Sequence, residues 1–382
     1  MSSLIKYVGV NDKKIDLFEG QYIVKNGISY NSYIILDDLI TIMDTVDIHF
    51  CDAWISNIKE ILKNKIPSFL VIHHMEPDHT GSVLKLLEVY PDITIIGNTK
   101  TFAFLKQFYP YYNFDKIKVI TNNEYVVIGK NSLKFIFAPM IHWPEVMFTY
   151  VCEMGALFSA DAFGKFGSLD IKDEWENEAR RYYIGIVGKY GIQVQNTLKN
   201  VSSLNIKAIY PLHGPVIDKN ITKALELYNK WSKYEYEDNG VLIVYSSIYG
   251  HTKEAALYLE NELKNKINCQ IFDIARCDIH CAVSDAFKYK TLVLATTTYN
   301  SKIFPIMHHF IDLLVERNYK NRTIGIIENG TWNPQASKVI KELLLPLQDI
   351  KYLTHNVTIL SSMNDKNKED ISLLATEIID NK

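Results

Sequence analysis

The pattern of apolar residues changes near residue 240, and this change constrains the fold more than any other feature of the chain. After it, short apolar runs alternate with amphipathic stretches of about ten to fifteen residues, as strands alternate with helices in βαβ units. The strand-like runs are VLIVYSS, INCQIFDI, TLVLATTTY, RTIGIIENG and VTILSS. This part of the sequence therefore predicts a parallel sheet with helices on both faces.

The two parts of the chain are predicted to form separate α/β domains. Five strands in about 140 residues fit a doubly wound, flavodoxin-like sheet better than the six-stranded dinucleotide-binding sheet. Before residue 235, β-branched and aromatic runs such as LKFIFAPM and MFTYVCEMGALFSA follow one another with few helices between them, which is typical of stacked sheets. A helix-like stretch and a polar joint ending at Asn239-Gly240 connect the two patterns. In a chain of 382 residues, we expect domains at 1–238 and 239–382.

Composition excludes several classes of function. The 41 basic and 44 acidic side chains give a formal net charge of 41 − 44 = −3, which offers no positive field for a nucleic acid. No apolar run is long enough to span a membrane, and the N-terminal MSSLIKYVGVNDKK lacks the apolar core of a signal peptide, so we expect a cytoplasmic protein. The five cysteines are scattered, and Cys277-Asp-Ile-His280-Cys281 has no second cysteine pair to complete a metal site. We expect ordinary thiols and no iron–sulfur or rubredoxin-type centre.

The loop after the first strand of the second domain is a candidate phosphate site. It matches neither G-x-G-x-x-G nor G-x-x-x-x-G-K-[ST], which argues against NAD and ATP. Its hydroxyls and the N-terminus of the following helix suit the phosphate of a mononucleotide, although a simple helix cap is an alternative reading. The candidate residues are Ser247, Ile248, Tyr249, Gly250, His251 and Thr252.

Two further loops each place an aromatic residue at the carboxyl end of a strand, where a flat ring could stack on it. An exposed tyrosine and tryptophan could instead serve a protein interface. Taken with the phosphate loop, these loops predict flavin mononucleotide (FMN). The residues are Thr298, Tyr299 and Asn300 in one loop, and Gly330, Thr331, Trp332 and Asn333 in the other.

The densest group of potential metal ligands lies in VIHHMEPDHTGS, where an H-x-E-x-D-H spacing follows a strand. A solvated polar loop is the alternative interpretation. Three more candidates lie at the ends of later strand-like runs, and seven ligands are too many for one ion, so we expect two metals and a bridging carboxylate. The ligands are His74, Glu76, Asp78, His79, His142, Asp161 and His213, whereas His73 should point away because neighbouring residues of an extended segment alternate.

The type of metal is suggested by Glu76. A zinc hydrolase of this type would more usually have an imidazole at that position, and a carboxylate shifts the preference towards iron or manganese. We therefore favour a di-iron centre, with zinc still possible. A metal pair combined with a flavin indicates multi-electron chemistry on a small gas.

The whole chain resembles the flavodiiron proteins. The resemblance rests on YNSYII, H-x-E-x-D-H-x-G-S, MIHWPE, LFSADAFG, RRYY, LHGP and S-x-Y-G-x-T. It implies an αββα metallo-β-lactamase-like sandwich followed by a five-stranded doubly wound flavodoxin-like domain. It also implies two iron ions, one bound by His74, Glu76 and His142 and the other by Asp78, His79 and His213, with Asp161 as the bridge.

The resemblance further implies the reduction of dioxygen to water or of nitric oxide to nitrous oxide, in protection of an anaerobic or microaerobic cell. It implies a head-to-tail homodimer or a dimer of dimers, with Tyr22 and Tyr182 near the gas pocket. The electron donor would be external, such as rubredoxin, a reduced deazaflavin or another carrier. The preference between the two gases stays open.

Two departures from the family pattern concern the flavin loops. Ala295-Thr296-Thr297-Thr298 replaces a frequent Gly-Ser before the threonine, and Asn333-Pro334 stands where Ser-Gly is frequent. Both put the flavin potential in doubt. Two rival functions are a zinc-dependent hydrolase with an appended flavodoxin module and an electron-transfer protein with a vestigial metal site.

Overall fold

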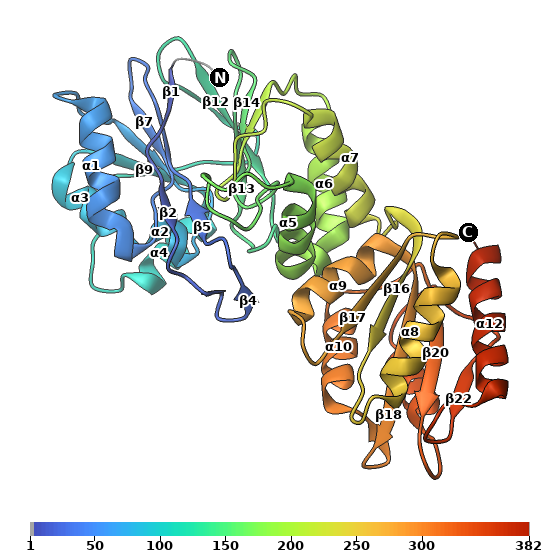
Figure 1. Cartoon of the computed structure of the whole chain (residues 1–382). Coiled ribbons are helices and arrows are strands. Elements are labelled where there is room, and N and C mark those ends of the chain that lie inside the picture. The colour runs from blue at the N-terminus through green and yellow to red at the C-terminus, as the bar shows by residue number, and fades with distance from the viewer. Residues whose placement is uncertain (1–3, 382) are drawn as a thin grey trace. The chain divides into compact units, whose positions relative to one another are not determined.

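The computed structural model describes residues 4–381, and the chain divides into two compact units, Met1–Asn229 and Lys230–Lys382 (Figure 1). The predicted division at residue 238 differs from these units only in the segment 230–238. No helix within the described residues is both long and apolar enough to cross a membrane.

The first unit contains two sheets, each of which forms one layer (Figure 1). In spatial order, the first sheet consists of β1 (Ile5–Tyr7), β6 (Tyr33–Ile35), β7 (Thr41–Met43), β8 (Phe69–Val71), β9 (Thr94–Gly97) and β10 (Ile117–Val119). The second consists of β11 (Tyr125–Val127), β12 (Ser132–Phe137), β13 (Met147–Val151), β14 (Ala156–Phe158) and β15 (Ala208–Tyr210). Two short ribbons pair β2 (Val10–Asp12) with β5 (Ile28–Tyr30) and β3 (Leu17–Phe18) with β4 (Tyr22–Ile23).

Helices cover the outer faces of this sandwich, which confirms the expected αββα arrangement (Figure 1). The expectation that few helices lie between the strand-like runs is wrong. The short helix 51–62 buries Trp54, Ile58 and Leu62 at helical spacing, a pattern that the β-rich surroundings obscure. The helical segments are η1 (Ile48–Phe50), α1 (Cys51–Leu62), α2 (Pro77–Thr80), α3 (Val83–Val89), α4 (Thr99–Phe108), α5 (Trp175–Tyr182), the π-helix η2 (Tyr183–Val187), η3 (Gly188–Tyr190), α6 (Gly191–Val201) and α7 (Ile221–Ser232).

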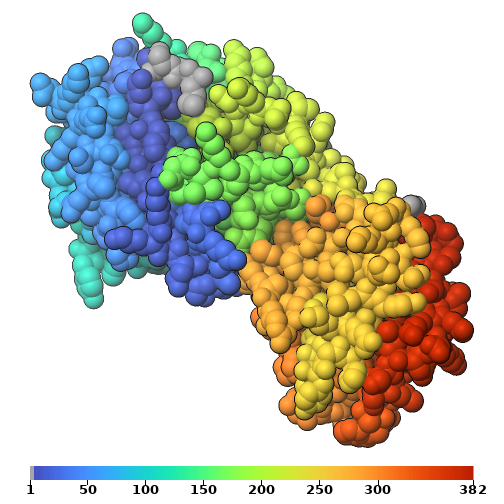
Figure 2. Space-filling view, in the orientation of Figure 1, coloured from blue at the N-terminus to red at the C-terminus, as the bar shows by residue number. Residues whose placement is uncertain are grey.

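The alternation of side chains along the first sheet explains the layers. Ile34 and Ile42 belong to the core beneath α1, α3 and α4, whereas their neighbours Ile35 and Met43 belong to the core shared with the second sheet. Both faces of these strands are therefore buried. The candidate metal ligands of the first unit accordingly lie beyond the ends of its strands. In Figure 2 the N-terminal strands lie beside the segment around residue 170, where Leu169 N–H donates to Asn11 Oδ1 at 2.8 Å.

The second unit is a doubly wound sheet, as predicted. Its strands follow the order β17 (Cys269–Asp273), β16 (Asp238–Tyr245), β18 (Tyr289–Tyr299), β20 (Arg322–Asn329) and β21 (Ile350–Tyr352), with β19 (Lys302–Ile303) on β18 and β22 (Val357–Ile359) on β20. The principal order is the 2-1-3-4-5 order of flavodoxin-like folds. The five expected strands become seven because the last one is in two pieces and β19 forms a short hairpin with β18.

Five helices flank this sheet: α8 (His251–Leu263), α9 (Ile279–Lys288), α10 (Pro305–Glu316), α11 (Ala336–Leu343) and α12 (Asp365–Asp380) (Figure 1). The sequence reading missed α9. Asp278 caps its N-terminus by accepting a hydrogen bond from His280 N–H, so the segment that resembles a metal clip is the start of a helix. Burial raises the pKa of the Cys277 thiol to about 11, which keeps it protonated.

The segment that precedes β16 is bound to the second unit by Arg322. The guanidinium Nη1 of this buried arginine lies 2.6 Å from the carbonyl oxygen of Tyr234, 2.9 Å from that of Lys320 and 3.3 Å from that of Asn321. Its Nη2 donates to the carbonyl oxygen of Phe287. Residues 230–238 are thus held to the sheet before its first strand begins.

One carboxylate of the second unit predicts a pH-dependent stability. Burial would raise the pKa of Glu377, but hydrogen bonds from N–H and side-chain groups of Thr354 and His355 lower it from 4.5 to about 2. A depressed pKa stabilises the fold above the unfolded value of about 4.5, and this stabilisation is lost as the pH falls towards 2. We expect Glu377→Gln to cost about 1–2 kcal/mol near neutral pH, after allowance for solvent screening, and less on acidification.

Urea unfolding followed by circular dichroism from neutral to acidic pH measures this difference. Glu369→Gln, at an exposed carboxylate of the same helix, is the control and should change the free energy of unfolding by less than about 0.5 kcal/mol. A cost for Glu377→Gln that does not vary with pH would contradict the prediction.

Candidate functional site

The predicted metal ligands all follow the ends of strands in the first unit. His74 and Glu76 lie in the loop after β8, and the helical turn α2 carries Asp78 and His79. His142 lies between β12 and β13, whereas Asp161 and His213 follow β14 and β15. The structure brings the seven side chains together in two groups, each with ligand atoms within 4.8 Å of one another.

The first group combines two imidazoles and a carboxylate. Glu76 Oε2 lies 3.2 Å from His74 Nε2 and 3.0 Å from His142 Nε2, and the two nitrogen atoms are 3.2 Å apart. His74 is fully buried, and His142 and Glu76 are mostly buried. Three ligand atoms therefore converge on one point with little access for bulk water.

The second group repeats this arrangement. Asp78 Oδ2 lies 3.3 Å from His79 Nε2 and 3.3 Å from His213 Nε2. The two imidazole nitrogens are 3.1 Å apart. Both histidines are fully buried, so a second point of convergence lies beneath the surface.

Asp161 lies between the two groups and turns one oxygen towards each. Its Oδ2 is 3.4 Å from His74 Nε2 and 3.1 Å from His142 Nε2. Its Oδ1 is 3.2 Å from His79 Nε2 and 3.6 Å from His213 Nε2. This is the placement that a carboxylate bridging two metal ions requires.

The chemistry of this donor set fits two cations. Within residues 4–381, the oxygens of Asp78 and Asp161 are buried and accept no hydrogen bond of normal geometry. Ligand atoms about 2.1 Å from one ion lie roughly 3.0–3.4 Å apart, which matches the separations within each group. Burial would raise the pKa of Asp161, but His74 and His79 outweigh it and hold that pKa well below its usual range. The site thus keeps Asp161 anionic.

Residues outside the predicted set orient the ligands. Glu145 Oε1 accepts a hydrogen bond from His74 Nδ1 at 2.8 Å, and His213 Nδ1 donates to the carbonyl oxygen of Ser29 at 2.7 Å. In a neutral ring, both Nε2 atoms then keep a lone pair for a metal. The sequence offered one signal for this role, because Glu145 belongs to the MIHWPE motif that also contains His142.

His73 points away from the ligands, as predicted. Its Nδ1 contacts Asp44 Oδ2, its backbone N–H donates to Asp44 Oδ1 at 2.7 Å, and its Nε2 lies 2.7 Å from Thr149 Oγ1. These contacts use both ring nitrogens of His73, so this residue anchors the loop that carries His74.

The aromatic residues near the ligands have different surroundings. Tyr22 is buried and its hydroxyl donates to the carbonyl oxygen of Gly185 at 2.8 Å. The Tyr182 ring lies 5.5 Å from the His213 ring, and its buried hydroxyl has no hydrogen-bond partner among the described residues. The Trp143 ring lies 5.2 Å from that of His74 and forms a wall of the site.

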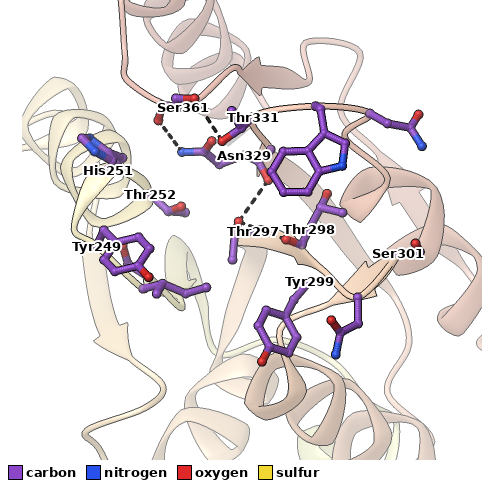
Figure 3. A pocket seen from close by; sticks show the side chains of 16 residues that line it. Tyr249, His251, Thr252, Thr297, Thr298, Tyr299, Ser301, Asn329, Thr331 and Ser361 are labelled. Carbon is purple, nitrogen blue, oxygen red and sulfur yellow. Dashed lines mark hydrogen bonds between the residues drawn. The ribbon is translucent and has the colours of Figure 1, made fainter.

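A pocket of about 620 Å³ lies at the carboxyl ends of β16, β18 and β20 in the second unit (Figure 3). Of the predicted cofactor residues, all but Gly250 line it. Gly250 precedes α8 with φ +101°, a left-handed conformation that favours glycine, and its N–H donates to Ser247 Oγ at 3.1 Å. Sequence reading missed four lining residues, which are Thr297, Ser301, Asn329 and Ser361.

The pocket combines hydroxyl groups with three exposed aromatic residues, Tyr249, Tyr299 and Trp332. Asn329 Nδ2 donates to the carbonyl oxygen of Ser361 at 2.9 Å, and Ser361 Oγ lies 3.1 Å from Thr331 Oγ1, so this side is held together by polar contacts (Figure 3). Tyr249 is 89% exposed and Trp332 81% exposed, so both rings are free to cover a flat ligand. The pocket therefore suits a phosphate-bearing aromatic cofactor.

Comparison with known proteins agrees with a candidate metal site in the first unit and a cofactor pocket in the second. A family model described as ODP family beta lactamase matches residues 28–214, and one described as Flavodoxin domain matches residues 242–357. Nitric oxide reductase from Moorella thermoacetica is 29% identical over 351 residues, which cover 89% of this chain and 88% of that protein. An uncharacterized protein from Methanocaldococcus jannaschii is 31% identical over 314 residues, which cover 80% of this chain and 79% of that protein.

A solved structure has the same two-domain order. A single-site variant of the flavo di-iron protein from Thermotoga maritima superimposes with a TM-score of 0.86 at 26% identity, covering 98% of this chain and 96% of that chain. The similarity between the two folds extends over nearly the whole length of both chains. The chain therefore belongs to the flavodiiron proteins, a family of oxidoreductases.

Proposed function

We propose that this protein reduces dioxygen to water, nitric oxide to nitrous oxide, or both, with FMN and a non-haem di-iron centre as its cofactors. The observation that carries this proposal is the position of Asp161, with one oxygen towards each of two matching ligand groups. A bound metal pair would supply electrons to a small gas, and bound FMN would supply those electrons one at a time.

Each group of candidate ligands would hold one iron. His74, Glu76 and His142 would hold the first, Asp78, His79 and His213 the second, and Asp161 would contribute to both. The terminal carboxylates, Glu76 and Asp78, are hard anionic donors that favour iron over zinc. The buried imidazoles keep bulk water away from the gas.

Tyr182 is the protein group best placed to donate a hydrogen bond to the gas. Its hydroxyl is buried and without a partner among residues 4–381, and its ring lies beside that of His213. Burial and the neighbouring carboxylates raise the pKa of Tyr182 well above its usual value, so its hydroxyl stays protonated at neutral pH and can donate a hydrogen bond. Tyr22 already donates to Gly185 and supports this wall of the site through Phe166, whose ring is 5.6 Å away.

The electrons come from a separate carrier such as rubredoxin or a reduced deazaflavin. Protection of an anaerobic or microaerobic cytoplasm from these gases is the role we propose, and a head-to-tail homodimer would pair one subunit's FMN with the other's iron centre. The exposed Tyr249 and Trp332 at the flavin pocket are consistent with contacts to such a carrier or subunit.

Substitution of Glu76 tests the proposal. Glu76→Ala removes a terminal ligand from one group only, so we expect consumption of both gases to fall about a hundredfold or more while FMN stays bound. Anaerobically purified protein is analysed for iron and FMN, and consumption of the two gases is compared with one reductant. Glu88→Ala, at an exposed carboxylate of α3, is the matched control and should leave both rates unchanged.

The outcome also separates the rival functions. Full turnover by Glu76→Ala would contradict the ligand assignment. Protein that contains zinc alone and hydrolyses a substrate would support the hydrolase alternative, and protein that binds FMN but consumes neither gas would support simple electron transfer.

A further inference from the structure

A buried carboxylate contacts one ligand histidine from behind. The side chain of Glu145 is fully buried, and its Oε1 accepts hydrogen bonds from His74 Nδ1 and from Met75 N–H, both at 2.8 Å. Asn98 Nδ2 donates to the backbone carbonyl oxygen of Glu145 at 2.6 Å and fixes this part of the chain. Within the described residues, the second oxygen, Oε2, is buried without a hydrogen-bond partner.

The second ligand group lacks an equivalent anion. His213 Nδ1 donates to a neutral acceptor, the carbonyl oxygen of Ser29, at 2.7 Å. The Nδ1 of His79 is buried and has no hydrogen-bond partner within residues 4–381. The two otherwise matching groups therefore differ by one negative charge placed behind His74.

The negative charge of Glu145 affects the metal position to which His74 contributes. Burying a carboxylate raises the free energy of the fold unless a nearby positive charge compensates it. A cation bound at His74 Nε2 would compensate Glu145 through the hydrogen-bonded imidazole ring. A carboxylate that accepts a hydrogen bond from Nδ1–H also makes Nε2 a stronger donor to a metal. Stronger donation favours the more highly charged ferric ion over the ferrous ion.

We propose that Glu145 is a positioning residue that makes the two iron positions unequal, an inference that rests on the proposed di-iron function. The iron held by His74, Glu76 and His142 is bound more tightly and is harder to reduce. The first electron is therefore held at the other position, where the Tyr182 ring lies beside His213.

The chain contains a matched control for this proposal. Asp44 accepts a hydrogen bond from the backbone N–H of His73 at 2.7 Å and contacts its Nδ1, just as Glu145 contacts His74 and the adjacent backbone. His73 is not a ligand, because its Nε2 contacts Thr149 Oγ1. Asp44 thus performs the same structural task on the same loop with no path to a metal.

The experiment compares Glu145→Gln with Asp44→Asn in protein loaded with Mössbauer-active iron. Glutamine keeps the Oε1 acceptor and places its amide nitrogen where Oε2 has no partner, so the substitution chiefly removes charge. Competition with a chelator measures the affinity for each iron, and Mössbauer spectra report each iron separately. In Glu145→Gln we expect one iron to be bound about 10–100-fold more weakly and its doublet alone to shift. Asp44→Asn should leave both irons as in the unaltered protein.

Equal changes at both irons, no change at either, or the same change in Asp44→Asn would overturn the proposal. If Glu145→Gln fails to fold, the unaltered protein provides the decisive measurement, because its two irons must show unequal affinities. Two irons of equal affinity would contradict this inference alone, whereas protein that binds no iron would contradict the proposed function as well.

Discussion

Replacement of Asp161 by alanine is expected to abolish the di-iron centre and to lower gas consumption by about a thousandfold or more. Asp161 turns Oδ2 towards His74 and His142 and Oδ1 towards His79 and His213, so its removal takes one ligand from each metal. It also removes the charge that holds two cations close together. A loss of several kcal/mol in metal binding and in transition-state stabilisation corresponds to this factor.

Asp161→Asn distinguishes the loss of a bridging carboxylate from the loss of side-chain volume. Asparagine has nearly the same shape but only one oxygen, so it can serve one iron and not both. We expect this variant to retain roughly one iron, to keep its FMN and to consume neither gas at an appreciable rate. Iron content, flavin absorbance and gas consumption measure these outcomes. Two tightly bound irons with full turnover in Asp161→Asn would contradict the bridging role.

The second large effect is expected at Arg322, in the other unit. Arg322→Ala leaves the carbonyl oxygens of Tyr234 and Phe287 without their buried donor and removes one of the contacts that hold the segment before β16 to the second unit. The loss of one partner from a buried, charge-assisted set of hydrogen bonds typically costs about 3–5 kcal/mol. We expect this loss in the unfolding of the second unit, with iron binding in the first unit unchanged.

Two further arginine variants control this prediction. Arg322→Lys keeps the charge but not the two-pronged donor, so it should recover part of the stability. Arg276→Ala removes an exposed arginine paired with Asp273 and should cost less than about 1 kcal/mol. Chemical unfolding followed by FMN release measures the second unit. A cost for Arg322→Ala no larger than that for Arg276→Ala would show that Arg322 does not anchor the segment.

The local parts of both sites could be predicted from the sequence because neighbouring residues determine them. The spacing in VIHHMEPDHTGS places His74 and Glu76 in one loop and Asp78 and His79 in the helical turn that follows. Alternation of strands and helices after residue 240 similarly predicted the doubly wound sheet, and the ends of its strands predicted most of the flavin pocket. In each case, the periodicity of the backbone decides which side chains share a face.

The positions of most helices in the first unit and the start of the second unit could not be predicted in the same way. Helix α1 lies between the strands β7 and β8, so its apolar spacing competes with β patterns on either side. The segment 230–238 is polar and looks like a linker, yet Arg322 holds it to the sheet from more than eighty positions away in the sequence. Contacts of that range leave no periodic pattern.

By itself, the sequence predicted the fold class, the seven candidate ligands and most of the loops that line the pocket of the second unit, because each depends on residue type and local spacing. Only the tertiary structure decided that Asp161 turns one oxygen to each metal position and that Glu145 lies behind His74 alone. Those relations join strand ends that are distant in sequence, and the packing of two sheets sets their distances to a few tenths of an ångström. A carboxylate such as Glu145, hydrogen-bonded to a ligand histidine, changes the affinity for a metal. No sequence motif indicates which of the two metal positions it is next to.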